Sequence, residues 1–352
     1  MTHLWLRAET KKNEERSALT PSVAKTLMEN GDSLLTQDLK SLIGCTIAES
    51  GSWRSAPLDA YIIGLKELPE NDDSPLPHTH IMFAHCYKNQ EGWKDVLSRF
   101  VRGKGLLLDL EFLMLNGRRV AAYGYYAGFA GSAVALDVWA HQILNPGERY
   151  PKINSYPNEP ALIEHTKELL HKASAQIGRT PKVMVMGAKG RCGTGAGDFA
   201  RRVGINKKDI IEWDMEETKK GGPFYEILES DIFVNCIYLS SKIPPFLTKE
   251  MLDQPKKLTV ISDVSCDATN PNNPIPVYFG ATTFDDPLIN IKTKTQDVDV
   301  IAIDHLPSLL PREASDMFAK DLLNTLLQLP KRQESVVWSD AEKLFNEKVK
   351  LL

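Results

Sequence analysis

The sequence has no apolar run as long as the ~18 residues that a membrane-spanning helix requires. Its opening, MTHLWLRAETKKNEERS, meets charge before the apolar core of a secretory signal can form. Cysteine is scarce and odd in number, and it lacks paired spacing, so neither a disulfide framework nor a zinc ribbon is indicated. The five cysteines are Cys45, Cys86, Cys192, Cys236 and Cys266. We therefore expect a protein of a reducing, intracellular compartment.

Charge of neither sign predominates, because 42 Lys and Arg face 46 Asp and Glu and leave a net charge of -4. A nucleic-acid binder would normally show a basic face, and a disordered chain would not reach a hydrophobic fraction of 42%. The C-terminal Lys-Leu-Leu lacks the Ser-Lys-Leu peroxisomal signal. A cytoplasmic location is the expectation, with a peroxisomal one left open. We also expect a monomer that handles a small molecule.

Short aliphatic runs separated by turn residues are present throughout, and 352 residues correspond to about two α/β domains. The runs are too apolar for alternation, so parallel sheets covered on both faces are expected. The strands expected in the first half are 4–7, 45–48, 61–63, 81–84 and 106–109. Those expected in the second half are 182–186, 209–213, 231–236, 258–261 and 298–303.

Helices are expected between these strands. Thr20 and Pro21 are typical of a helix start, and this helix would end near Gly31. The apolar, small-residue stretch 125–144 predicts a buried helix that carries the chain between lobes, and a polar helix is expected near 160–177.

Two further helices are expected at the end of the chain, one from Pro311 to Pro330 and one that Ser339 and Glu342 would start as a capping box. They have no strands beside them in the sequence, so we expect them to pack back onto the first lobe. That arrangement makes the first domain discontinuous.

A glycine-rich loop follows the strand expected at 182–186. In GAKGRCG, Gly187, Gly190 and Gly193 would let a pyrophosphate approach the backbone at a helix N-terminus. Asp214 ends the next strand, 21 residues beyond Gly193, where an acid would bind the adenosine ribose hydroxyls. This combination predicts NAD binding. A plain strand–helix turn and a solvated strand-end carboxylate are the alternatives.

The same residues bear on the choice between NAD and NADP. Asp214 would repel the 2′-phosphate of NADP, whereas Lys219 and Lys220 nearby leave that cofactor open. The predicted fold is thus α/β, with two Rossmann-like lobes, mostly parallel sheets and an interdomain cleft. Residues 1–124 with 312–352 would form the substrate and catalytic domain, and residues 125–311 the NAD-binding domain.

Ionisable side chains follow several strands of the first lobe. Lys66, His85, Asp109 and Glu111 come after the strands expected at 61–63, 81–84 and 106–109. Ligands of open parallel sheets bind at the carboxyl ends of strands, so these residues form a candidate acid–base set. Each alone would more often be an ordinary surface residue.

Arginines add a second signal in the same lobe. Arg16 lies in ERSALTP, and Arg118 and Arg119 follow Glu111. Guanidinium groups bind carboxylates bidentately, so a polycarboxylate substrate is indicated, unless both segments are solvated basic turns. His78, His80, His85 and Cys86 show neither HExxH nor paired-cysteine spacing, so no metal is expected.

Several long blocks carry a resemblance to a known family: LRAETKKNEERSALTP, IIGLKELPE, FAHCYKNQEGW, DLEFL with GRRVAAYGYYAGFAG, GAKGRCGTGA, EWDMEETKKGGPF, DIFVNCIYLS, DVSCDATNPNNPIP and IDHLPSLLPREAS. Together they resemble the NAD-dependent, L-lysine-forming saccharopine dehydrogenases of fungal lysine biosynthesis. The chain departs from the family pattern after Gly31, where it is shorter and a strand would be incomplete beneath Arg16.

This resemblance implies the oxidative deamination of saccharopine to lysine and 2-oxoglutarate, with Lys66 and His85 as acid–base catalysts and Glu111 as a charge that tunes them. It implies substrate contacts at Arg16, Lys66, Gln90, Arg119 and Tyr123. It implies NAD contacts at Arg118, Gly190, Arg191, Cys192, Gly193, Asp214, Thr218, Tyr238, Ser265, Ile303, Asp304, His305 and Leu306.

The chemistry of that reaction agrees with the residue inventory. Saccharopine carries three carboxylates on a secondary amine, so arginines are needed to orient it. Our hypothesis is that Lys66 removes the amine proton, and that His85 manages water addition to the imine and collapse of the carbinolamine.

Two cysteines form a further hypothesis. Cys192 follows the first strand of the cofactor lobe and Cys236 ends a later one. The first and fourth strands of a 3-2-1-4 order are neighbours, so a disulfide between them is within reach, and it would block NAD. Two inert buried thiols are the alternative.

Two other functions remain open. One is an amino-acid dehydrogenase of the alanine dehydrogenase and transhydrogenase type, since ERSALTP and a paired Lys and His resemble that group too. The other is a non-catalytic NAD-binding protein, which would need the glycine loop and Asp214 but not the ionisable groups of the first lobe.

Overall fold

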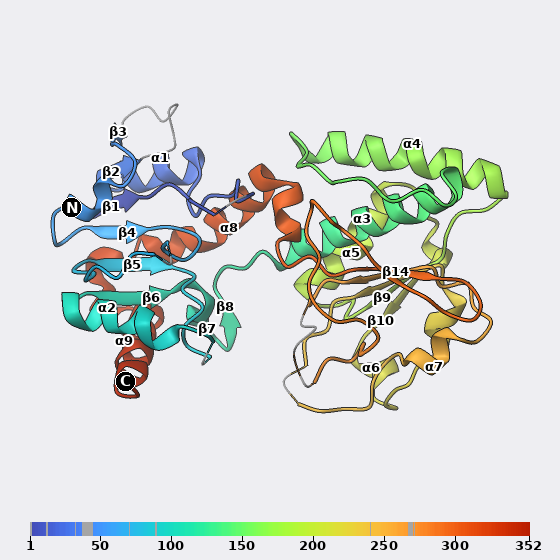
Figure 1. Ribbon diagram of the computed structural model, residues 1–352. Coiled ribbons are helices and arrows are strands. Elements are labelled where there is room, and N and C mark those ends of the chain that lie inside the picture. Colours follow the sequence, from blue (N-terminus) through green and yellow to red (C-terminus); the bar gives the residue numbers. More distant parts are fainter. Residues whose placement is uncertain are drawn as a thin grey trace. The chain divides into compact units, whose positions relative to one another are not determined.

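A computed structural model shows two compact units in the chain (Figure 1). One unit comprises Met1–Ala122 and Pro311–Leu352, and the other comprises Tyr123–Leu310. The structure describes residues 2–11, 13–31, 33–36, 45–69, 71–88, 90–239, 241–266, 270 and 272–352. The expected cleft between the lobes stays a prediction.

The first unit is built on a six-stranded parallel sheet. Its strands are β1 (His3–Leu6), β2 (Ser33–Thr36), β3 (Thr46–Ile47), β4 (Tyr61–Ile63), β5 (Thr79–Met82) and β6 (Leu106–Asp109). They lie in the order β3-β2-β1-β4-β5-β6, which can be followed in Figure 1. The chain winds outward from β1 to β3 and returns to the other side of β1 at β4. The loops after β1 and β4 therefore flank a topological switch point, where such sheets bind ligands.

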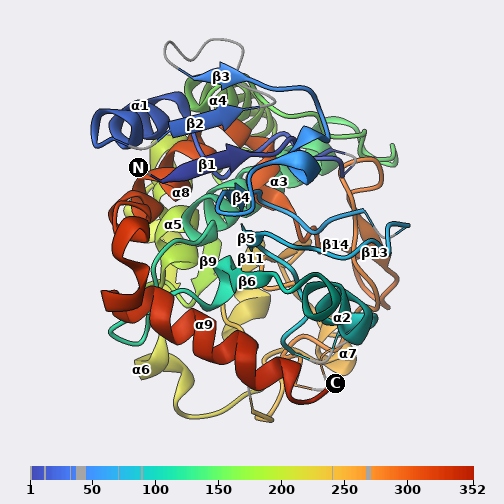
Figure 2. The ribbon, with the colours of Figure 1, turned by 90° about the vertical axis from the view of Figure 1, so that its left-hand side faces the viewer.

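Helices cover this sheet on both faces. They are α1 (Pro21–Glu29), α2 (Trp93–Gly103), α8 (Pro311–Leu326) and α9 (Val336–Val349). Phe100 of α2 and Phe345 of α9 share a buried cluster with Trp5 and Ile62 of the sheet. α9 runs beside β6 (Figure 2). A short hairpin, β7 (Met114–Leu115) with β8 (Arg118–Arg119), follows β6.

Several sequence predictions for this unit need correction. β2 forms directly after α1, where no strand was expected, and α2 was missed although Trp93, Leu97 and Phe100 recur at helical spacing. The chain was expected to be shortened after Gly31, and residues 37–44 of that segment lie outside the described residues. β5 begins two residues earlier than expected, because His80 is packed inside the core between aromatic rings.

The C-terminal helices also differ from the prediction. α8 ends at Leu326, and a 3-10 segment (Leu329–Glu334) follows instead of helix up to Pro330. The N-cap of α9 is Ser335, so Ser339 lies inside the helix and the capping box with Glu342 is wrong. The start is set by the buried face of Val337, Trp338 and Ala341, and Glu342 is paired with Arg332.

The second unit contains a six-stranded sheet, parallel except for one edge strand. Its strands are β9 (Val183–Met186), β10 (Ile210–Trp213), β11 (Ile232–Asn235), β12 (Val260–Asp263), β13 (Ile289–Ile291) and β14 (Val298–Ile301). The order is β10-β9-β11-β12-β14-β13, with β13 antiparallel to β14. β13 was not expected, and β12 begins two residues later than predicted. The switch point lies between β9 and β11.

One face of this sheet is covered by α3 (Gly124–Leu144) and α5 (Arg191–Arg202), with α4 (Glu159–Ile177) against α3. The small residues of α3 let it approach α5 closely. A Cβ at Gly128 would lie 1.8 Å from the Cys192 carbonyl oxygen, and one at Gly195 would lie 1.9 Å from that of Tyr125. α3 is therefore a core helix of the second unit.

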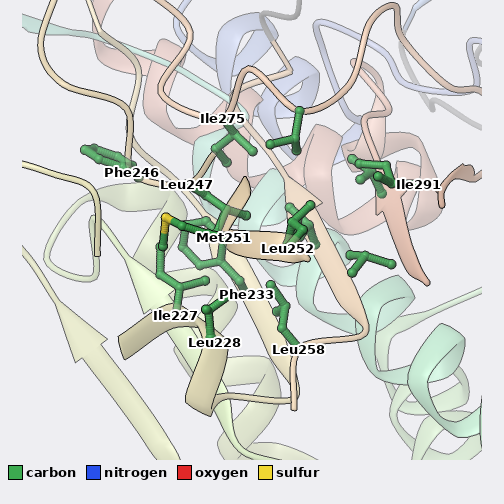
Figure 3. Packing of buried hydrophobic residues seen from close by; sticks show 14 of the residues in the cluster. Ile227, Leu228, Phe233, Phe246, Leu247, Met251, Leu252, Leu258, Ile275 and Ile291 are labelled. Atoms are coloured by element: carbon green, nitrogen blue, oxygen red, sulfur yellow. The ribbon is translucent and has the colours of Figure 1, made fainter. Parts of the chain in front are cut away.

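The other face is covered by short segments, among them the 3-10 segment Tyr225–Glu229 and α7 (Lys249–Leu252), whereas α6 (Met215–Thr218) follows β10 and has no buried residue. Figure 3 shows Phe233 of β11 among Ile227, Leu228, Met251 and Leu252 in one buried cluster. This continuous apolar layer holds β9 and β11 rigidly, and the loops that follow those strands start from it.

No helix among the described residues is long and apolar enough to cross a membrane.

Candidate functional site

Lys66 and Glu67 lie in the turn that follows β4, and His85 follows β5. His85 adopts a left-handed conformation, with a φ of 48°, and its ring stacks on Phe83 with a centroid distance of 6.2 Å. Its Nε2 is 3.6 Å from Oε1 of Glu67. Because β4 and β5 are adjacent parallel strands, the fold brings these side chains to one rim, as expected for neighbouring strand ends.

The electrostatics of this rim favour a neutral His85. Burial lowers the pKa of His85, and although Glu67 raises it, the nearby charge of Lys66 lowers it further. Glu67 itself is bound by Lys11, at 2.7 Å. Burial raises the pKa of Glu67, but the hydrogen bonds from Lys11 and from the Glu67 backbone N–H outweigh burial and keep the pKa below its usual value. A neutral imidazole beside an ionised carboxylate is suited to accept a proton.

Glu111 is the centre of a second charge cluster on the same unit. Its Oε1 accepts hydrogen bonds from Lys88 and Arg119, each at 2.7 Å. Burial opposes ionisation, but Lys88 and Arg119 together lower the pKa of Glu111. The predicted substrate arginine, Arg119, is thus already oriented by a carboxylate. The tuning role of Glu111 stays a prediction, and its negative charge does act on His85.

Asp109 differs from the other strand-end candidates because it is buried, with 1% of its surface exposed. Its carboxylate accepts hydrogen bonds from the backbone N–H groups of Glu111, at 2.9 Å, and Ala84, at 3.2 Å. Burial raises the pKa of Asp109 to about 7. The group ties the ends of β5 and β6 together, so its part in the acid–base set at the rim was an incorrect expectation.

The raised pKa of Asp109 predicts that the free energy of unfolding falls as the pH rises. The folded pKa of about 7 lies above the ~3.9 of an unfolded aspartate, so folding takes up a proton between these values. The contribution of Asp109 is fully present below pH ~4 and declines by up to ~1.4 kcal/mol per pH unit as the pH rises towards 7. Asp109→Asn removes this decline.

Urea unfolding at pH 5 and pH 7.5 checks this, and the variant should gain stability relative to the native chain at the higher pH. The lost hydrogen bond costs the same at both values. Asp73→Asn, on the exposed side chain that pairs with Arg102, is the control and should leave the pH dependence unchanged. An equal stability difference for Asp109→Asn at both pH values would contradict the prediction.

Arg16 lies in the loop after β1, at the switch point, and is only 6% exposed. Its Nε and Nη2 bind the carboxylate of Glu14 at 2.8 and 2.6 Å, and Glu14 also accepts the Arg16 backbone N–H. This bidentate pair fixes the guanidinium in one orientation. The sequence prediction omitted Glu14, although its spacing of two residues before Arg16 is a local signal. Substrate binding by Arg16 stays a prediction.

The remaining first-unit candidates occupy different places. Gln90 accepts the backbone N–H of Lys88 through Oε1 at 2.8 Å and precedes α2. Arg118 and Arg119 are exposed on β8. Tyr123, expected as a substrate contact, is the N-cap of α3 and the first residue of the second unit. Their ligand contacts stay predictions.

In the second unit the glycine loop joins β9 to α5. Gly187 has a φ of 88°, which favours glycine, and its N–H bonds to the Trp213 carbonyl of β10 at 2.8 Å. A Cβ at Gly193 would lie 2.1 Å from the Gly187 carbonyl oxygen, whereas at Gly190 the nearest atom would be 3.4 Å away. Gly187 and Gly193 are thus required by the turn itself. Gly190, the N-cap of α5, leaves the helix N-terminus open to a ligand.

The side chain of Asp214 joins the end of β10 to α6 and to the glycine loop. Its side chain caps α6 by accepting the Met215 N–H at 2.9 Å, and its other oxygen accepts the Lys189 N–H of the glycine loop at 2.8 Å. These two backbone hydrogen bonds lower the pKa of Asp214, so the group is ionised. Each oxygen retains a lone pair for a ribose hydroxyl. The acid and the loop are therefore one hydrogen-bonded assembly.

The lysines that left NADP open are engaged elsewhere. Lys219 binds Glu216 at 2.6 Å and Lys220 binds Glu226 at 2.5 Å. Thr218 donates its hydroxyl to the Asp214 carbonyl at 2.9 Å. This arrangement favours a cofactor without a 2′-phosphate.

Other predicted cofactor residues lie at the ends of β11, β12 and β14. Ser265 donates to buried Asp263 at 2.7 Å, and Tyr278, which was not a candidate, donates to the same carboxylate at 2.7 Å. Asp304 binds the His305 ring at 2.8 Å. Tyr238 and Arg191 are exposed, whereas Ile303 and Leu306 are buried at 1% exposure each. The contacts of these residues with NAD stay predictions.

Cys192 and Cys236 are free thiols that hydrogen-bond to each other beside the glycine loop. The bond to Cys192, followed by burial, holds the pKa of Cys236 well above its usual range. β9 and β11 are adjacent, as expected. The predicted 3-2-1-4 order is wrong, because the order β10-β9-β11-β12 makes β11 the third strand of the sheet along the chain. The disulfide stays a prediction. The described part of the chain contains no group of three or more His, Cys, Asp or Glu side chains arranged to hold a metal ion.

Comparison with known proteins finds relatives for the whole chain. Residues 5–130 match the family Alanine dehydrogenase/PNT, N-terminal domain, and residues 224–349 match Alanine dehydrogenase/PNT, C-terminal domain. Saccharopine dehydrogenase (NAD(+), L-lysine-forming) of Schizosaccharomyces pombe is 55% identical, with 99% of each chain covered. The proteins of that name from Emericella nidulans (99% of this chain, 98% of that one) and Candida albicans (98% and 97%) are 54% and 52% identical.

Solved structures share the fold. An L-alanine dehydrogenase superposes with a TM-score of 0.67 at 14% identity, covering 99% of this chain and 94% of that one. The transhydrogenase from Sinorhizobium meliloti gives 0.64 at 17% identity, covering 97% of each chain. These similarities confirm the predicted α/β class with Rossmann-like lobes.

Proposed function

The chain belongs to the family of NAD-dependent, L-lysine-forming saccharopine dehydrogenases, and we propose that it converts saccharopine, NAD⁺ and water to lysine, 2-oxoglutarate, NADH and a proton. This is the last step of the aminoadipate route of lysine biosynthesis. The observation that carries the proposal is the 55% sequence identity with the Schizosaccharomyces pombe protein, over 99% of both chains. Lys66, Glu67 and His85 gathered on one rim support it.

The second unit fits NAD. Gly190 leaves the N-terminus of the 12-residue helix α5 uncovered, and Asp214 is ionised at the end of β10. The helix N–H groups would hold the pyrophosphate and Asp214 the adenosine ribose. NAD⁺, when bound, supplies the acceptor for the substrate's hydride.

In the first unit, Lys66 would take the proton of the secondary amine as the hydride leaves the neighbouring carbon. Water then adds to the resulting imine, and neutral His85 would accept its proton. The imine nitrogen takes back a proton from Lys66 to give the carbinolamine. This collapses as His85 returns its proton to the amine nitrogen and the hydroxyl proton passes to Lys66, which releases lysine and 2-oxoglutarate. Glu67 and Glu111 would stabilise the imidazolium that forms at His85.

Substrate carboxylates would bind to Arg16 and Arg119, each of which a glutamate already orients. Two guanidinium groups, with Gln90 near the second cluster, suit a ligand with three carboxylates. An amino acid with one carboxylate would offer a single acidic group to these two arginines. This supports saccharopine over alanine.

Asp214→Asn is expected to raise the NADP-to-NAD ratio of kcat/KM by about tenfold or more, because the negative charge that repels a 2′-phosphate is lost. Asn caps helices as well as Asp, so α6 should persist, but its single acceptor oxygen cannot also accept the Lys189 N–H, and the affinity for both cofactors should fall. Steady-state kinetics with both cofactors measures the ratio. The control is Glu168→Gln, an exposed carboxylate on α4 of the same unit that is paired with Lys172. An unchanged ratio in Asp214→Asn would contradict the assignment.

The proposed function is tested by following NADH at 340 nm with saccharopine or alanine as substrate and NAD or NADP as cofactor. We expect turnover with saccharopine and NAD. Activity with alanine alone would assign an alanine dehydrogenase-type enzyme. Nucleotide binding without turnover would assign a non-catalytic protein.

We also propose a cytoplasmic location and a monomeric state. Five free thiols in the described structure support a reducing compartment. Gel filtration tests the second point, and a dimer-sized species would overturn it.

A further inference from the structure

Arg7 and Glu9 are two charged residues in the loop after β1 that have no role in the reaction described above. Their side chains are almost completely buried, at 2% and 7% exposure, and they form an ion pair with Nη1 of Arg7 3.7 Å from Oε2 of Glu9. Taking both charges out of water costs several kcal/mol per ion, and apolar residues of similar size are often as stable. A buried pair is therefore poorly explained by stability alone.

The Arg7–Glu9 pair binds the backbone of Lys66 at both its N–H and its carbonyl group. Glu9 accepts the backbone N–H of Leu65 through Oε1 at 2.6 Å and that of Lys66 through Oε2 at 2.9 Å. Nη2 of Arg7 donates to the carbonyl oxygen of Lys66. Both peptide groups of Lys66 are thus held by two charged groups that also bind each other.

Gly64 makes this arrangement possible. The Arg7 guanidinium lies directly against it, since a Cβ at this position would be 2.2 Å from Nε and 2.4 Å from Cζ of Arg7. The turn after β4 is therefore fitted to the guanidinium as well as hydrogen-bonded to it. β1 and β4 are adjacent at the switch point, so the Arg7–Glu9 ion pair links the segments that follow these two strands.

We propose that the Arg7–Glu9 ion pair is a positioning device that fixes the backbone of Lys66 and so aims its amine at the reacting nitrogen of the substrate. This inference rests on the proposed role of Lys66 as the base. The amine of lysine lies at the end of a chain of four methylene groups. A small tilt of the backbone therefore moves the amine by a comparable distance or more. Misplacing a catalytic group by ~1 Å can cost about 10²-fold in rate.

A double-mutant cycle separates positioning from a merely structural role. Glu9→Gln keeps the size of the side chain but offers one acceptor oxygen to two N–H groups and removes the charge facing Arg7. In the native background it should lower kcat about tenfold or more, with the Kd for NAD within about twofold of the native value. In the Lys66→Met background the same change should alter the residual kcat by less than about twofold.

The control is Asp72→Asn, which breaks the contact of another largely buried arginine, Arg99, at 3.2 Å in the same unit. It should lower the melting temperature but leave kcat unchanged in both backgrounds. An equal fold loss from Glu9→Gln with and without Lys66 would overturn the inference, and so would native kcat in Glu9→Gln. Unchanged turnover in Lys66→Met alone would instead overturn the proposed function of Lys66.

Gly64→Ala provides a second route should Glu9→Gln fold poorly. The added methyl would displace the guanidinium while Arg7 and Glu9 both remain. It should lower kcat only where Lys66 is present. An identical loss in the Lys66→Met background would contradict the proposed positioning of Lys66 by the Arg7–Glu9 ion pair.

Discussion

Lys66→Met is expected to lower kcat for saccharopine oxidation by about 10²-fold or more, because general base catalysis typically contributes 10²–10⁴-fold. Methionine has nearly the volume of the lysine stem but cannot accept a proton. His85 and its neighbour Glu67, 3.6 Å away in the native chain, are both retained in this variant, so His85 should still accept the proton of water. The first proton transfer is therefore the step that fails.

Steady-state kinetics and NADH binding together measure the effect. The Kd for NADH should stay within about twofold, since the glycine loop and Asp214 belong to the other unit. Lys25→Met, at an exposed position on α1 of the same unit, should leave both quantities unchanged. Turnover of Lys66→Met close to the native rate would refute the assignment.

Gly193→Ala is expected to weaken NAD binding by about 10²-fold or more. The new methyl would lie 2.1 Å from the Gly187 carbonyl oxygen and 2.5 Å from the Ala188 Cα, so the loop backbone must move away. Such movement breaks the hydrogen bonds from Gly187 and Ala188 to Trp213 and misplaces the N–H groups that would face the pyrophosphate.

Gly190→Ala is the matched variant, because its methyl would have no atom closer than 3.4 Å and the loop need not move. It should fold with a native melting temperature and lose affinity only through contact with the ligand. Isothermal titration with NADH compares the two variants. Native affinity in a folded Gly193→Ala protein would contradict the reading of the loop.

Much of the fold could be predicted from local patterns. The parallel strands were recognisable because a run such as VMVM must be buried on both faces, and the glycine loop because its strand and helix are contiguous in sequence. β13 was missed because a short edge strand has little periodicity. The start of α9 was misplaced because the capping-box pattern is weaker than the buried face of the helix.

The candidate site shows the same division. Lys66, His85 and Glu111 could be selected because polar groups after parallel strands meet at one edge of the sheet. Their partners could not, since Glu67, Lys11 and Lys88 are ordinary charged residues until the fold brings them within 4 Å.

The sequence by itself determined the class of fold, the nucleotide loop and the types of group available for catalysis, because each depends on residues close together in the chain. Only the tertiary structure decided which of those groups are ionised, buried or held in place. Asp109 and Glu111, two positions apart, have pKa values shifted in opposite directions, because one is enclosed in the core and the other faces two cations. Such differences arise from distances across strands, which no local pattern encodes.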